Sequence, residues 1–223
     1  MAVIQSGLTT DLLTIDPTFK AARITPKPTE HGTLGHYKWG ASTGILPAAL
    51  GANSEIVQFR WQNSTNLALI NNIRVSACVT TTFFAAGVPI EIDLIKSTAW
   101  SVAGTGGNAP TIAAGLKARS NMGNSLMVAG DLRIATTAAL GAGTKTLEAN
   151  SMVSIVAPGP ITASLNGQII APGTVMWEPD VGDGEHPLLL ATNEGFSIRS
   201  VAVPATGTWR FAIYVNWTEV ASY

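Results

Sequence analysis

The chain has 223 residues, of which only 12% are charged, and its net charge at pH 7 is −1. A nucleic-acid-binding protein needs a basic surface, and 13 Lys and Arg residues without clustering provide none, so we exclude nucleic acid as a partner. Mean hydropathy is +0.27, but no apolar run approaches the ~18 residues of a membrane-spanning helix, so we also expect no membrane partner. The low charge favours a surface that other subunits cover.

Residues 1–53 differ in composition from the rest of the chain. Prolines and glycines interrupt regular structure there. Apolar anchors recur among them, which a disordered segment would lack: Leu12, Ile15, Phe19, Ile24, Tyr37 and Trp39. We therefore predict an extended N-terminal arm over 1–53, lying on its own domain or on a neighbour, and a β-domain over 54–223. The first residues resemble no signal peptide, so we predict synthesis in a cytoplasm.

From Glu55 onward the sequence shows the two-residue alternation of β-strands. Apolar residues alternate over 57–61, 73–79 and 90–94, and Asn71-Asn72 predicts a bend or bulge within the second run. A short helical turn fits 110–119. Further strand candidates, bounded by Gly and Pro turns, cover 131–136, 151–156, 174–177, 186–192 and 195–203.

The clearest strand runs from Thr208 to Glu219. A strand sends alternate side chains to opposite faces, so five large apolar residues share one face: Trp209, Phe211, Ile213, Val215 and Trp217. Burying each is worth about 1.5–3 kcal/mol, which makes this strand the predicted centre of the core. About eight to ten short strands and no long helix predict an all-β fold, a β-sandwich of the jelly-roll type.

Cys78 is the only cysteine, so no internal disulfide forms, and its apolar neighbours predict a small buried side chain. The six tryptophans could form stacking platforms for sugars. Three of them lie on predicted core faces, which favours packing instead. Trp100 and Trp177 remain as candidates for contact with a ligand or another subunit.

The search for chemistry finds no enzyme. Gly141–Thr146 lacks the spacing of a phosphate-binding loop and fits a hairpin turn. No nucleophile has a recognisable base. The acidic stretch 178–186 offers the weak metal candidates Asp180, Asp183 and Glu185, which could hold Ca²⁺ or, as paired carboxylates, cleave glycosides. A solvated loop is the favoured interpretation, so we predict no cofactor and no catalytic residue.

Several segments resemble virion structural proteins of tailed bacteriophages and prophages: Asp16–Arg23, Glu55–Trp61, His186–Arg199 and Pro204–Phe211. The resemblance spans most of the chain, is vaguest over 140–185, and carries no catalytic motif. Within this class the chain looks most like a head decoration, or cement, protein. Such proteins are often β-sandwich or jelly-roll trimers that bridge neighbouring major capsid subunits.

The resemblance implies a homotrimer on the capsid surface of a virion, with the major capsid protein as partner. The apolar anchors are the candidates for capsid or subunit contact: Phe19, Ile24, Tyr37, Trp39, Trp100 and Trp177. Two alternatives stay open. One is a tail or head-fibre component, and the other is a carbohydrate-binding module or glycosidase that uses the Trp177–His186 loop.

Overall fold

The computed structural model describes residues 34–84, 88–158, 167–180, 185–202 and 204–222. The chain divides into two units, Met1–Glu30 and His31–Tyr223, and every described element belongs to the second. Regular structure in the described part is almost entirely β, with one short helix, α1 (Ile112–Gly115), at the predicted helical turn.

In the described ranges, twelve strands form two antiparallel sheets. The first sheet contains β1 (Gly35–Ser42), β2 (Leu46–Pro47), β4 (Leu67–Val79), β9 (Gln168–Trp177), β10 (Leu188–Leu190) and β12 (Thr208–Val220). The second sheet contains β3 (Ser54–Trp61), β5 (Ile90–Val102), β6 (Leu132–Ile134), β7 (Thr144–Leu147), β8 (Val153–Ala157) and β11 (Glu194–Ala202). The strands predicted over the second half of the chain thus all form, with bounds shifted by a few residues.

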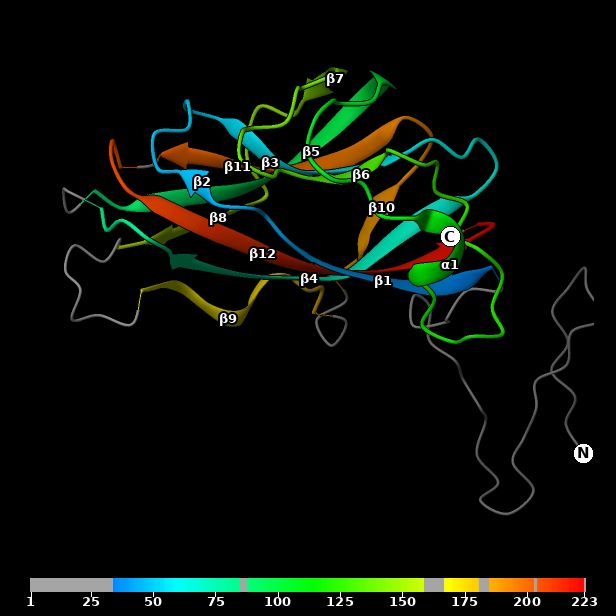
Figure 1. The fold of residues 1–223 in the computed structure, drawn as a ribbon. Coiled ribbons are helices and arrows are strands. Elements are labelled where there is room, and N and C mark those ends of the chain that lie inside the picture. The colour runs from blue at the N-terminus through cyan, green and yellow to red at the C-terminus, as the bar shows by residue number, and fades with distance from the viewer. Residues whose placement is uncertain (1–33, 85–87, 159–166, 181–184, 203, 223) are drawn as a thin grey trace, which may run out of the picture. The chain divides into compact units, whose positions relative to one another are not determined.

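The pairing order identifies the kind of sandwich. Eight strands follow the orders β1-β12-β4-β9 and β3-β11-β5-β8, so each sheet alternates strands from distant parts of the chain. This is the interlocked double Greek key of a jelly roll. Figure 1 shows the two sheets as two stacked layers. The predicted all-β sandwich is confirmed.

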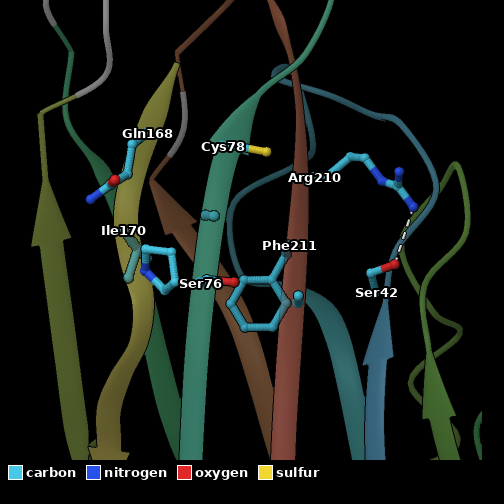
Figure 2. A pocket seen from close by; sticks show the side chains of 10 residues that line it. Ser42, Ser76, Cys78, Gln168, Ile170, Arg210 and Phe211 are labelled. Carbon is cyan, nitrogen blue, oxygen red and sulfur yellow. Dashed lines mark hydrogen bonds between the residues drawn. The ribbon is translucent and has the colours of Figure 1, made fainter. Parts of the chain in front are cut away.

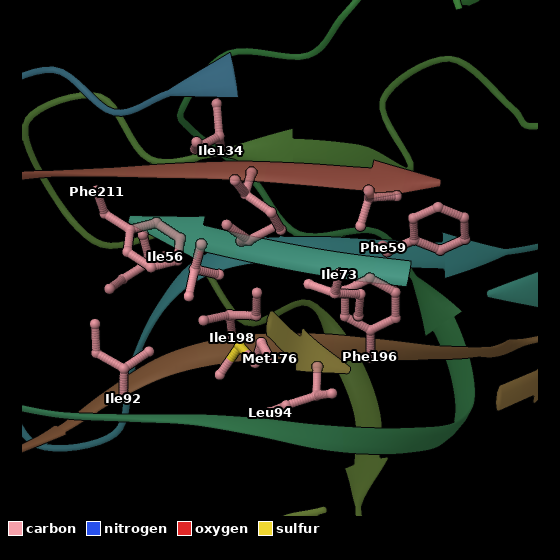
Figure 3. Close-up of a cluster of buried hydrophobic side chains, with 14 of the residues drawn as sticks. Ile56, Phe59, Ile73, Ile92, Leu94, Ile134, Met176, Phe196, Ile198 and Phe211 are labelled. Carbon is pink, nitrogen blue, oxygen red and sulfur yellow. The ribbon is translucent and has the colours of Figure 1, made fainter. Parts of the chain in front are cut away.

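β12 pairs with β4 along nearly its whole length, and on its other side with β1 over residues 212–219 and with β2 at its start. All five alternating apolar residues of this strand, from Trp209 to Trp217, are buried, while Arg210 faces outward. Side chains of the two sheets meet between the layers, such as Phe211 and Ile73 from one and Leu94 and Ile198 from the other (Figure 3). The predicted centre of the core is therefore correct.

A β-bulge lies at Asn71, as predicted. Asn216 pairs with Asn72 and Trp217 pairs with Ile70, so Asn71 has no partner opposite it on β12. Its side-chain amide instead donates a hydrogen bond to Thr218 Oγ1 at 2.7 Å. The extra residue allows Ile70 and Ile73, three positions apart, to face the same core.

The described part of the predicted arm lies on the chain's own domain. β1 pairs with residues 212–219 of β12, and its Tyr37 ring stacks on Trp217 with centroids 5.7 Å apart. The sandwich therefore extends N-terminally of the predicted boundary at residue 54 and includes residues from Gly35 onward. Residues 1–33, with the contact candidates Phe19 and Ile24, lie outside the described residues.

The prediction that Cys78 is buried is wrong. Its neighbours Ala77 and Val79 point into the core, so the alternation of β4 turns Cys78 to the outer face, where it is exposed. Cys78 lies opposite Arg210 of β12 and shares that outer face with it.

Candidate interaction surface

Three of the predicted contact residues are part of the interior. Tyr37, Trp39 and Trp100 are buried, so their rings pack within this chain rather than against a partner. Trp100 donates its indole N–H to the Val102 carbonyl at 3.0 Å. Trp177 is half-buried at the end of β9 and packs against the core. These aromatic rings are buried because their strands pair within the sheets. The sequence-based choice of aromatic contact residues does not take this pairing into account.

The described residues of the acidic stretch have partners within this chain. The Glu185 carboxylate accepts a hydrogen bond from the Asp180 backbone N–H at 2.8 Å, and Glu178 pairs with Arg74 at 3.5 Å. Asp183 lies outside the described residues. Within the described ranges no group of three or more His, Cys, Asp or Glu side chains is placed to hold a metal ion.

A layer of polar side chains is buried on the outer face of the second sheet, beneath parts of the segment between residues 101 and 151, which contact it through Ser101, Gly141 and Ser151. It contains three ion pairs: Arg199–Asp93 at 2.5 Å, Lys145–Glu55 at 2.6 Å and Arg60–Asp131 at 3.3 Å. The covering segment approaches so closely that a Cβ on Gly104 would lie 2.0 Å from Gln58 Oε1. This layer fixes the cover to the sheet.

Burial and hydrogen bonding shift the pKa values of two cations in this layer. Desolvation lowers the pKa of Lys145, while its hydrogen bond to Glu55 raises it. The hydrogen bond to Asp93 raises the pKa of Arg199. Lys145 Nζ also lies 4.0 Å from the centre of the Trp100 ring, a cation–π contact. The Lys145 side chain, which the sequence analysis assigned to a hairpin turn, thus points into the buried polar layer.

An open groove of about 410 Å³ lies on the outer face of the first sheet, across β1, β4, β9 and β12. Its floor is made of small residues such as Ser76 and Ala212. Figure 2 shows Cys78 on β4 between Gln168 on β9 and Arg210 on β12. The Arg210 guanidinium donates to the Thr43 carbonyl and to Ser42 Oγ, both at 3.1 Å, so it is held at the rim by its own chain.

Two strands on one lateral side of the sandwich, β8 and β9, contain no charged residue. β8 pairs with β5 next to β7, β9 pairs with β4 next to β10, and β8 and β9 contact each other. The sequence from Ala149 to Trp177, which contains both strands, has no Asp, Glu, Lys or Arg. Val156 is 62% exposed and Val175 is 45% exposed. We call β8 and β9 together the uncharged edge.

The β8 strand of the uncharged edge lacks the usual protection against pairing. Proteins commonly place lysines, other charges, prolines or bulges on edge strands to prevent association with other chains. β9 has Pro172 and an irregular register, but β8 has neither charge nor proline. Such an edge is suited to burial against another polypeptide. The prediction of contact residues missed it, although the absence of charge is visible in the sequence.

Comparison with known proteins gives no match: no family model, no curated protein and no solved structure is similar to this chain. Within the described part of the chain, no helix is long and apolar enough to cross a membrane.

Proposed function

We propose that this chain is a non-enzymatic capsid decoration protein of a tailed bacteriophage. It assembles as a homotrimer, binds the surface of the head and bridges neighbouring major capsid subunits. The protein is synthesised in the host cytoplasm and is then located in the virion, on the capsid surface. The assignment to a phage virion rests on the resemblance of several sequence segments to virion structural proteins of tailed bacteriophages. The observation that supports assembly is the uncharged edge, which presents exposed valines and an unprotected strand.

The chain would use two different surfaces for its two partners. The uncharged edge lies in the sandwich itself and is assigned to contact between copies. The segment 1–33 precedes β1 and is assigned to the capsid, because it contains the apolar anchors Leu12, Ile15, Phe19 and Ile24. Such a division allows the trimer to form before it meets the shell.

Binding to particles tests the proposal. Purified protein is mixed with capsids that lack it, from the phage that encodes the chain, and the bound protein is measured after sedimentation. A variant lacking residues 2–33 keeps β1 whole, so it should fold and no longer sediment with capsids. Saturating binding by that variant would refute the role of the segment. Failure of the full-length chain to bind would refute the decoration role.

Immunogold labelling of intact particles locates the protein independently of binding strength. Label spread over the head is the expected result. Label confined to the tail or to fibres would assign the chain to another virion structure and remove the decoration role.

A further inference from the structure

A single carboxylate oxygen in the buried polar layer gathers an amine and an amide. Glu55 Oε2 accepts hydrogen bonds from Lys145 Nζ at 2.6 Å and from Gln58 Nε2 at 2.5 Å. Ser197 Oγ donates to the same oxygen at 3.0 Å. The side-chain nitrogens of Lys145 and Gln58 are therefore held side by side on one atom.

A second pair of contacts fixes the same two nitrogens. Lys145 Nζ donates to the Ala142 carbonyl at 2.8 Å, and Gln58 Nε2 donates to the carbonyl of the preceding residue, Gly141, at 3.0 Å. Each of the two nitrogens thus donates one hydrogen bond to Glu55 and one to a backbone carbonyl, and the two carbonyls belong to successive residues. Groups held together in this way react with effective concentrations far above those in free solution.

The surroundings exclude water and favour an uncharged amine. The side chains of Lys145 and Glu55 are only 3% and 6% exposed, and Gln58 is buried. The Trp100 ring covers the amine and helps to exclude water, although the face of the ring attracts the ammonium form. Gln58 Oε1 is also buried, and in the described part of the chain no group donates a hydrogen bond to it. Burial disfavours the ammonium form, and the neutral amine is the nucleophile.

We propose that Lys145 and Gln58 form an intramolecular isopeptide bond, with Glu55 as the general base and acid. The Glu55 carboxylate takes a proton from the Lys145 ammonium, and the neutral Nζ attacks Gln58 Cδ. The Nζ–Cδ bond forms and the Cδ–Nε2 bond breaks, while Glu55 passes a proton from Nζ to Nε2. Ammonia leaves and takes up the first proton as ammonium, which restores the carboxylate. The reaction needs no oxidant and no cofactor.

The product would join β3 to β7 by a covalent bond across the cover of the second sheet. Residues 58 and 145 are far apart in sequence, so the bond closes a long loop and restricts the unfolded chain, as a disulfide would. This inference is independent of the proposed function.

The intact mass of the full-length chain tests whether the isopeptide bond forms. Denatured protein should be lighter than its sequence mass by one molecule of ammonia. Trypsin does not cleave after an acylated lysine, so the digest should contain residues 39–60 joined to residues 134–199. A full sequence mass, together with a free peptide 134–145, would overturn the proposal.

Two variants and a control identify the chemistry. Lys145→Arg keeps the positive charge but has no attacking amine, and Glu55→Gln removes the base, so both should show the full mass. Lys96→Arg changes another ion-paired lysine, 3.6 Å from Glu194, and should keep the ammonia deficit. Loss of ammonia that persists in Lys145→Arg would come from another site and would refute the assignment.

Discussion

Arg60 and Asp131 form an ion pair at 3.3 Å with both side chains almost wholly buried. The pair joins β3 to the residue before β6, and the Arg60 backbone N–H donates to the Asp131 carbonyl at 2.9 Å. Burial raises the pKa of Asp131 to about 6, although Arg60 and then Arg133 act to lower it. The cost of removing this carboxylate from water thus exceeds the attraction of its two cations.

The first prediction concerns the pH dependence of stability. The folded state holds the Asp131 proton more tightly than the unfolded chain, whose pKa is 3.8. The stability from this group is therefore full below pH 3.8 and is lost as the pH rises through about 6. Asp131→Asn does not titrate. Between acidic and neutral pH the wild type should lose roughly 3 kcal/mol of unfolding free energy relative to this variant.

Urea denaturation at several pH values measures this difference. A difference between wild type and Asp131→Asn that stays constant with pH, or that changes in the opposite direction, would contradict the raised pKa. The pH dependence of the difference carries the test, because Asp131→Asn stays neutral while the wild-type side chain gains its charge as the pH rises.

The second prediction tests the core. Trp209 is completely buried on β12 and donates to the Pro47 carbonyl at 3.3 Å. Trp209→Ala should lower the free energy of unfolding by about 3–5 kcal/mol, because it leaves a large cavity. Arg210→Ala, the neighbouring outward residue, should cost less than ~1 kcal/mol in the same denaturation experiment. Equal losses in the two variants would mean that the faces of β12 are misassigned.

The third prediction tests the uncharged edge. The wild type should have a mass near three times 23.2 kDa by light scattering. Val156→Lys places a charge on the exposed face of β8 and should yield monomers, because a buried lysine without a partner is costly. Val102→Lys introduces the same charge at a 55% exposed position outside the edge and should leave the trimer intact.

Two results would contradict this assignment. A wild-type monomer in solution would show that the edge does not join copies without a shell. A Val156→Lys trimer as stable as that of Val102→Lys would show that the interface lies elsewhere on the sandwich.

The fourth prediction tests the orientation of Cys78. Its side chain is exposed beside the groove on the outer face of the first sheet. A maleimide reagent should therefore modify the native protein at a rate within about tenfold of that for the urea-unfolded chain, since access rather than unfolding limits the reaction. Modification that requires unfolding would restore the original prediction of a buried cysteine.

The sequence predicts the framework well where a strand has one buried and one exposed face. The alternation from Trp209 to Trp217 identifies the central strand, and the two asparagines locate the bulge at Asn71. Cys78 follows the same rule. Its two neighbours are core residues, so strict alternation alone would have placed the cysteine on the outer face.

The buried polar layer is harder to predict. Gln58 and Arg60 alternate with apolar residues on β3, a pattern typical of a face exposed to water. They are buried because a segment distant in the sequence covers them, and this segment has little regular periodicity of its own. Lys145 likewise lies in a glycine-rich stretch typical of a turn. Its partner Glu55 is known only once the tertiary structure is known.

The position of β12 has a consequence for biosynthesis. Its partners in the first sheet, β1, β2 and β4, are all made long before it, and β1 and β4 do not pair with each other. While the ribosome is still translating residues before Thr208, the first sheet therefore has a gap at its centre. The nascent chain must hold β1 and β4 apart, or release them again, until the last strand emerges between them. Such late, long-range pairing folds slowly. A ribosome that stalls before β12 is translated would yield a chain whose first sheet lacks its central strand and which is prone to aggregate.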